Sequence, residues 1–168
     1  MARLARCLLL PLAVVASGCH IEDRTPTGSR HDEAAIQAVL TGYHRALATR
    51  DWARIGALEW HGATYATVAR LGSPGPDSRI EPLDSALTAL ARRVDSARPQ
   101  QYDVRVIRTD LRQEGNLAAA WVTTRRRLPA AAGASDAEWL ELVVLRRVGD
   151  AWRILSVARA NRQSAGSR

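Results

Sequence analysis

The spacing of the apolar residues changes once along this chain, and that change restricts the folds available to it. Over residues 36–47 and 83–94 the apolar positions follow the 3.6-residue period of an amphipathic helix. A shorter helix is predicted to begin at Trp52, because Asp51 before it is a suitable N-cap. Residues 63–71 are rich in β-formers and are predicted to form a strand.

After Tyr102 the pattern becomes that of strands. Four β-rich runs are predicted, at residues 104–111, 117–128, 139–148 and 152–160. Gly-containing turns separate the first run from the second and the third from the fourth, whereas residues 129–135 are expected to form a longer loop. Helices early in the chain and antiparallel strands late in it predict an α+β fold, with the sheet packed on the helices.

The N-terminus has the composition of an export signal. Arg3 and Arg6 precede an apolar stretch at residues 7–16, which is too short to cross ~30 Å of hydrocarbon as a helix. Residues 16–19 (Ala-Ser-Gly-Cys) then resemble the lipobox of bacterial lipoproteins, in which the cysteine is lipidated and becomes the new N-terminus. Lipidation is therefore predicted at Cys19. The alternative is an ordinary secreted protein in which Cys19 is a free thiol.

These features divide the chain into four parts. We predict a signal peptide at 1–18, a lipidated flexible tether at 19–31, one domain at 32–162 and a disordered tail at 163–168. The expected location is the bacterial cell envelope, with the domain in the periplasm or at the cell exterior and a lipid at Cys19 as its membrane anchor.

The basic balance of the chain does not indicate a nucleic-acid partner. Two of the 24 basic residues lie in the predicted signal peptide, so the mature chain has 22 against 17 acidic residues. An exported protein rarely meets nucleic acid, and attraction to anionic headgroups or a generally solvated surface accounts for the charge.

Three short segments carry a resemblance to a known family. Residues 43–47 (Tyr-His-Arg-Ala-Leu), 50–52 (Arg-Asp-Trp) and 149–154 (Gly-Asp-Ala-Trp-Arg-Ile) resemble fold markers of the SnoaL-like branch of the nuclear transport factor two-like superfamily, and the similarity covers residues 32–160. The resemblance implies a cone: N-terminal helices packed on a curved antiparallel sheet, with a pocket at the open end.

The resemblance leaves the activity open, because this fold serves isomerases, polyketide cyclases, hydrolases, dehydratases and many non-enzymes. In the isomerases a tyrosine on the first helix donates a hydrogen bond to the developing enolate, and Tyr43 matches that position. The position of the isomerase base is held here by Thr67, which cannot accept a proton at neutral pH. Asp103 or Asp110 could lie near the position of the second acid. We therefore predict a non-catalytic module that binds a small molecule or a partner; the alternative is an isomerase, cyclase or hydratase in which Tyr43 is catalytic.

Five residues are predicted to line the pocket: Tyr43, Tyr65, Thr67, Trp121 and Thr123. A small apolar ligand is the expected occupant. The four histidines show neither an HxH nor an HExxH spacing, and we expect no metal and no cofactor. In the cluster of three arginines at 125–127, strand alternation sends the middle residue to the opposite face. Two interpretations of this cluster remain: a solvated face of the sheet, or a site that binds an anion.

The last two strands predict self-association. In one of them Leu142 and Val144 alternate with Val143 and Leu145, so that both faces are apolar. The closing strand has the same property, with Trp152 and Ile154 on one face and Leu155 and Val157 on the other. One face covers the helices, and a homodimer is the expected cover of the other.

Overall fold

A computed structural model of the chain describes residues 30–68, 78–130 and 133–162. The predicted signal peptide, the lipidation site Cys19 and the predicted tail at 163–168 lie outside the described residues. None of the helices in the described part is both long and apolar enough to cross a membrane.

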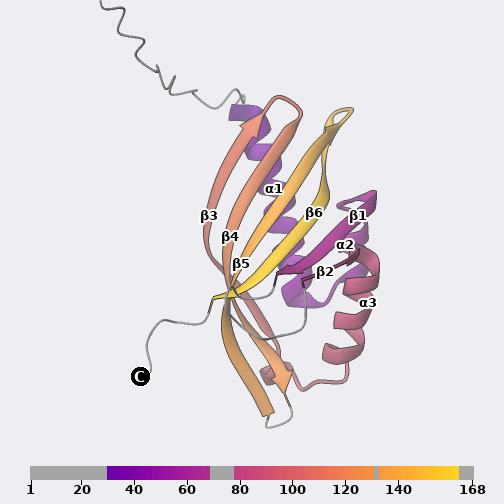
Figure 1. The fold of residues 1–168 in the computed structure, drawn as a ribbon, viewed down its shortest axis with the longest axis vertical. Helices are drawn as coiled ribbons and strands as arrows, with labels where there is room; N and C mark the ends of the chain where they lie inside the picture. Colours follow the sequence, from indigo (N-terminus) through magenta and orange to yellow (C-terminus); the bar gives the residue numbers. More distant parts are fainter. Residues whose placement is uncertain (1–29, 69–77, 131–132, 163–168) are drawn as a thin grey trace, which may run out of the picture.

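Three α-helices and six strands make up the fold (Figure 1). In chain order they are α1 (Arg30–Thr49), α2 (Trp52–Gly56), β1 (Glu59–Val68), β2 (Arg79–Pro82), α3 (Leu83–Val94), the short 3-10 helix η1 (Pro99–Gln101), β3 (Asp103–Glu114), β4 (Leu117–Ala130), β5 (Gly133–Val148) and β6 (Ala151–Arg162). The predicted N-cap of α2 is confirmed, since the Asp51 carboxylate accepts a hydrogen bond from the backbone N–H of Arg54 at 3.0 Å.

The strands form one curved sheet in the order β2-β1-β6-β5-β4-β3, and the helices lie on one face of it (Figure 1). This confirms the predicted α+β fold of helices on a curved sheet. The sheet is mixed, however, because β1 runs parallel to β6, while all other neighbouring pairs are antiparallel. Only strands joined by tight turns are obliged to be antiparallel, and a long stretch of chain separates β1 from β6.

Two details of the strands differ from the sequence prediction. The strand β2 was not expected, because its four residues include Pro82; it pairs with β1 at the sheet edge, where Tyr65 lies opposite Glu81. The predicted loop at 129–135 is largely strand, since pairing of β4 with β5 continues to Ala130 and Gly133. Pro129 is tolerated there because β3 ends its pairing at Arg127, so β4 is an edge strand beyond that point.

The hydrophobic core lies between α1 and the inner face of the sheet. The helix contributes its predicted apolar face, including Ile36, Leu40 and Leu47, all buried. From the sheet come Val143 and Leu145 of β5 and Trp152, Ile154 and Val157 of β6. Since every buried core residue of the described part lies between Ile36 and Val157, a chain that begins at His20 retains the whole of this core.

A bulge in β6 changes which of its residues face the core. The pairing of β5 with β6 shifts between Val144 and Leu145, so that Leu155 is an extra residue in β6. Residues on either side of it, Ile154 and Val157, therefore both point into the core. The prediction that Val157 lies on the opposite face from Ile154 is wrong for this reason.

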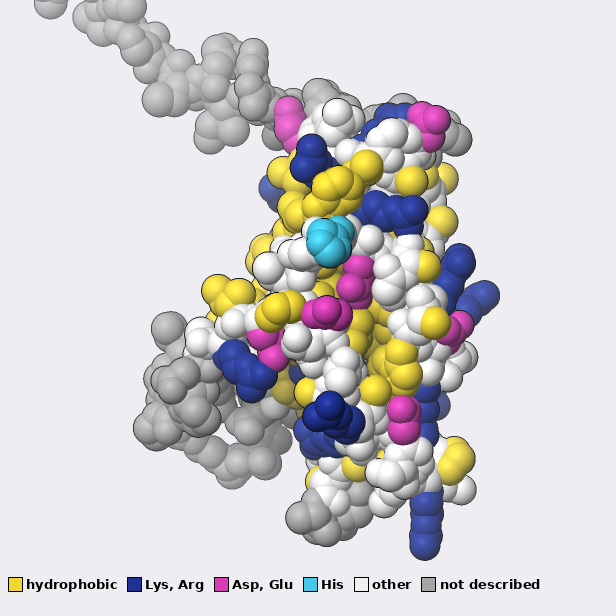
Figure 2. Space-filling view, turned by 90° about the vertical axis from the view of Figure 1, so that its right-hand side faces the viewer, with side chains coloured by type: hydrophobic (Ala, Val, Ile, Leu, Met, Phe, Trp, Pro, Cys, Tyr) yellow, Lys and Arg dark blue, Asp and Glu magenta, His cyan; other side chains and the backbone are white. Residues whose placement is uncertain are grey.

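Charged residues are spread over the surface. On the side that carries α3 and β2, Figure 2 shows basic and acidic side chains interspersed with apolar ones. Several arginines pair with acidic residues on the same or the next strand, such as Arg125 with Glu138 at 3.1 Å and Arg127 with Asp136 at 3.0 Å. Exposed pairs of this kind contribute little stability.

Candidate functional site

A cavity of about 280 Å³ lies between α3, α1 and the inner face of the sheet. Its apolar wall comes from two helices and consists of Leu47, Leu83, Ala86, Leu87, Ala89 and Leu90. Its polar wall comes from both helices and from four strands and consists of Tyr43, Tyr65, Thr67, Glu81, Arg93, Arg126 and Arg159. The volume is at the small end of the range for ligand pockets.

Three of the five predicted pocket residues lie together in this cavity: Tyr43 from α1, and Tyr65 and Thr67 from β1. The other two, Trp121 and Thr123, do not line it. Along β4 the even-numbered residues from Ala118 to Leu128 are buried, whereas the odd-numbered ones are exposed or half-buried, with the exception of Thr123, which is buried. Trp121 is 45% exposed on the outer face of the sheet and does not line this cavity.

Two inward positions further along β4 are held by Thr124 and Arg126, both buried. Arg126 is the middle residue of the arginine cluster, only 2% exposed, and it forms an ion pair with Glu141 of β5. Thr124 donates to the same carboxylate oxygen at 3.2 Å. Arg126 is therefore not part of a solvated sheet face, whereas its two neighbours in the arginine cluster are exposed to solvent.

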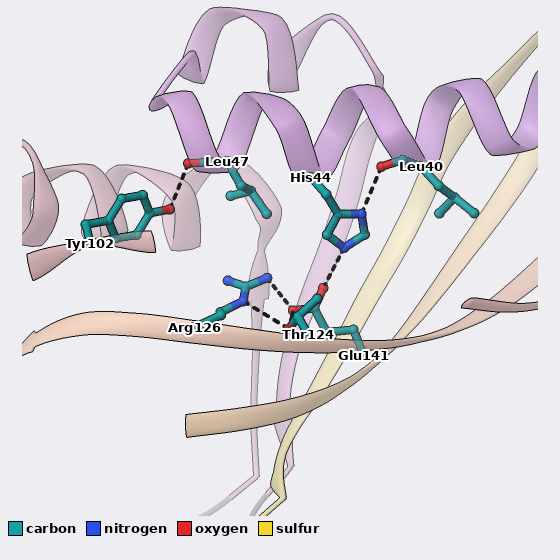
Figure 3. A network of polar contacts seen from close by, with 7 residues as sticks. All are labelled: Leu40, His44, Leu47, Tyr102, Thr124, Arg126 and Glu141. Carbon is teal, nitrogen blue, oxygen red and sulfur yellow. Dashed lines mark hydrogen bonds and ion pairs between the residues drawn. The ribbon is translucent and has the colours of Figure 1, made fainter. Parts of the chain in front are cut away.

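The second carboxylate oxygen of Glu141 faces α1 (Figure 3). There His44 Nε2 lies 3.3 Å from Glu141 Oε2, and Nδ1 lies 2.8 Å from the carbonyl oxygen of Leu40. Both ring nitrogens of His44 thus face oxygen atoms of the protein. Neither nitrogen is then left to accept a proton from a ligand.

Glu141 is fully buried and nevertheless ionised. Burial opposes its charge most strongly, but the positive charge of Arg126 and the contacts with His44 outweigh that effect and hold the pKa of Glu141 at about 2. The network thus joins α1 to β4 and β5 through one carboxylate. A buried carboxylate without such partners would be neutral.

Tyr43 lines the cavity as a hydrogen-bond donor. Burial, and then the negative charge of Glu141, raise the pKa of its hydroxyl above the ordinary value, so it stays protonated. Within the described residues its hydroxyl group has no hydrogen-bond partner, in contrast to Tyr102, whose hydroxyl donates to the carbonyl of Leu47 at 2.8 Å. Tyr43 therefore has an O–H group available to a ligand.

Arg159 of β6 supplies a positive charge to the cavity. Its guanidinium lies over the ring of Trp139 at 4.4 Å and over the ring of Tyr65 at 5.3 Å. In residues 30–68, 78–130 and 133–162 no acceptor contacts any of its side-chain nitrogens, and its Nε is buried. Burial, and then the nearby charge of Arg126, lower the pKa of Arg159 below its usual value.

The cavity offers few groups that could accept a proton. Thr67, which lines the cavity, cannot accept a proton at neutral pH, and the cavity carboxylate Glu81 is ion-paired with Arg79 on its own strand. Asp103 and Asp110, the sequence candidates for a second acid, do not line the cavity and pair instead with Arg105 at 2.6 Å and Arg108 at 2.9 Å. The described residues contain no group of three or more side chains placed to hold a metal ion.

Solved structures share this architecture. An uncharacterised cystatin-like protein from Caulobacter vibrioides matches with a TM-score of 0.64 and 16% identity, over 80% of this chain and 92% of that one. An NTF2-like protein from Pseudomonas putida matches with a TM-score of 0.62 and 13% identity, over 82% and 91% of the two chains. The chain has the nuclear transport factor two-like fold.

This fold alone does not assign an activity. No protein-family model and no curated protein sequence matches the chain. Among the structures with the same NTF2-like fold is an enzyme, the hexachlorocyclohexane dehydrochlorinase LinA-type3 of Novosphingobium barchaimii, with a TM-score of 0.61 and 12% identity over 79% of this chain and 88% of that one. The function therefore has to be argued from the cavity itself.

Proposed function

We propose that this NTF2-like protein is a membrane-anchored module of the bacterial cell envelope that binds a small molecule in its cavity without transforming it. The observation that carries the proposal is the composition of the cavity wall: an apolar side from α3 faces hydrogen-bond donors, namely Tyr43, Arg126 and Arg159. Donors on one side and apolar groups on the other orient a ligand and exclude water.

The same wall argues against catalysis. Proton transfer needs a group that can accept the proton within hydrogen-bond reach of the ligand. Thr67 cannot do so, His44 uses both ring nitrogens elsewhere, and Glu81 is paired with Arg79. The alternative, an isomerase, cyclase or hydratase, would depend on Glu81, which is the carboxylate among the described residues that line the cavity.

The catalytic alternative is tested with a steroid-like enone. We expect isomerisation at the background rate, because the expected base is replaced by Thr67. The absorbance of the conjugated product measures turnover. Turnover well above background that is lost in both Glu81→Gln and Tyr43→Phe would establish the enzyme and refute the binding module.

The anchor is tested separately, by metabolic labelling with a fatty acid. The lipobox-like residues 16–19 lead us to expect label in the wild type and complete loss of label in Cys19→Ser. Cys7→Ser is the matched control and should keep the label, because Cys7 lies in the segment predicted to be removed. Equal labelling of wild type and Cys19→Ser, or no labelling of either, would contradict the anchor.

A further inference from the structure

The charged side chains that line the cavity differ in how their charges are compensated. Arg126 is paired with Glu141, and Glu81 is paired with Arg79. Arg93 is exposed, and its guanidinium donates to the carbonyl of Pro129 at 2.7 Å. Arg159 is half-buried, and among the described charged residues of the lining it alone has neither an ion-pair partner nor a hydrogen-bond acceptor; its Nε is fully covered.

The packing around Arg159 holds its guanidinium ready for an acceptor. The guanidinium carbon of Arg159 lies 4.4 Å from the ring centre of Trp139 and 5.3 Å from that of Tyr65. These cation–π contacts use no N–H group as a donor to an oxygen, and Nε has no hydrogen-bond partner within the described residues. A planar carboxylate matches two such N–H groups at once.

A buried charge without a partner is unfavourable, and proteins rarely keep one unless a ligand neutralises it. Here the unpaired charge lines a cavity whose opposite wall is apolar, with Leu83, Leu87 and Leu90 of α3. The Tyr43 hydroxyl, protonated and without a partner in the described chain, is a further donor on the same lining. Since Arg93 is exposed to solvent, Arg159 is the positive charge that a ligand inside the cavity has to neutralise, and a single carboxylate does so.

We infer that the ligand of this cavity is a small monocarboxylate with an apolar body, whose carboxylate pairs with Arg159 while its apolar part packs on α3. This inference rests on the proposed binding function and deepens it, because it states the charge that a small apolar ligand must carry. It also assigns Arg159 as the residue that discriminates a carboxylate from its neutral analogue.

The test uses two pairs of probes of nearly equal shape, benzoate with benzamide and hexanoate with hexanamide. Titration calorimetry and tryptophan fluorescence are applied to the chain that begins at His20, which retains the whole described core. We expect each carboxylate to bind roughly ten- to a hundredfold more tightly than its amide, the range of a charge-assisted hydrogen bond. Trp139 lies against Arg159, so its emission should change on carboxylate binding.

Two variants make the test specific. Arg159→Met should bind each carboxylate no better than its amide. Without ligand it should melt at or above the wild-type temperature, because it removes a half-buried charge that has no ion-pair partner. A merely structural arginine would instead lower the melting temperature when replaced. Arg125→Met, an exposed arginine on the outer face, should bind like the wild type.

The outcomes separate this inference from the function on which it rests. If a carboxylate and its amide bind equally well, the inference is overturned, but the proposed binding function is not. Binding of neither pair up to tens of millimolar would overturn both. Discrimination that survives in Arg159→Met would assign the anion to another residue and would also overturn the inference.

Discussion

Replacing Glu141 by glutamine should cost about 3–5 kcal/mol of unfolding free energy, the range observed when one member of a buried ion pair is removed. Glu141 is fully buried, and its two oxygens accept from Arg126, Thr124 and His44. Glutamine preserves the shape but leaves the guanidinium of Arg126 buried without a counter-charge. Such a loss is a large share of the total of about 5–15 kcal/mol expected for a domain. Chemical denaturation, monitored by tryptophan fluorescence, measures it.

The matched control is Glu138→Gln on the same strand. Glu138 pairs with Arg125 at the surface, where both side chains are substantially exposed, and its loss should cost about 0.5 kcal/mol or less. A cost below about 1 kcal/mol for Glu141→Gln would mean that the network in Figure 3 does not stabilise the fold.

The same carboxylate predicts an acid-dependent loss of stability. The pKa of Glu141 is about 2 in the folded chain, against an ordinary value of 4.5. A lowered folded-state pKa contributes stability that is fully present above pH 4.5 and is lost as the pH falls towards 2; the shift corresponds to about 3 kcal/mol. Wild type should therefore lose stability over this interval, and this part of the pH dependence should be missing from Glu141→Gln.

The regular parts of the fold could be predicted from the sequence because they repeat one local rule over many residues. The first helix shows its period at Ile36, Leu40 and Leu47, and the structure buries all three. The strand β2 could not be found in this way, since four residues ending in Pro82 carry no period and are held by pairing with β1. The extension of β4 and β5 beyond Pro129 likewise depends on where β3 ends, which is not a local property.

The polar part of the site was missed for a different reason. Alternation along β4 separates Arg126 from Arg125 and Arg127, but it does not say which face is buried. The two large apolar residues Leu117 and Trp121 lie on the outer face, so the positions of the bulkiest apolar side chains do not identify the buried face of β4. Glu141 did carry a signal: it shares the alternation of Val143 and Leu145, and an acid in such a position needs a buried partner.

The position of Arg159 in the cavity could not be predicted from the sequence. In a regular strand it would lie on the face opposite to Trp152 and Ile154. The bulge at Leu155 reverses the alternation after it, so that Arg159 lines the cavity. Bulges of one residue arise from pairing between strands, and nothing in the local sequence around Leu155 marks one.

The outer face of the sheet leads to the second prediction of large effect. Leu117 and Trp121 of β4 are 49% and 45% exposed there, and Trp121 is paired across the sheet with Leu142 of β5. Val144 lies two residues further along the same face, opposite Ala119. We call Leu117, Trp121, Leu142 and Val144 the outer patch. Contiguous apolar surface of this kind is seldom left in water by a monomer.

A second copy of the chain is the cover that we propose for the outer patch. An isologous dimer places the same patch of both copies in contact, so one apolar surface covers the other without a further partner. At ~25 cal/mol per Å² of apolar surface removed from water, even a few hundred Å² on each copy favours association by several kcal/mol before the entropic cost of binding. Probes of this dimer must lie on the outer patch. Val143 and Val157 face the core, so charges there would unfold the domain.

We therefore expect the chain beginning at His20 to be a dimer at micromolar concentration. Leu142→Arg should raise the dimer dissociation constant at least about a hundredfold, because the interface would have to bury an unpaired charge. Light scattering over a concentration series measures both values, and circular dichroism checks that the variant keeps its fold. Ile80→Arg is the matched control: Ile80 is 76% exposed on β2, at the far end of the sheet order from β3, and its change should leave the dimer intact. A wild type that stays monomeric at several hundred micromolar would refute the dimer. A dimer that tolerates Leu142→Arg but is lost in Ile80→Arg would move the interface away from the outer patch.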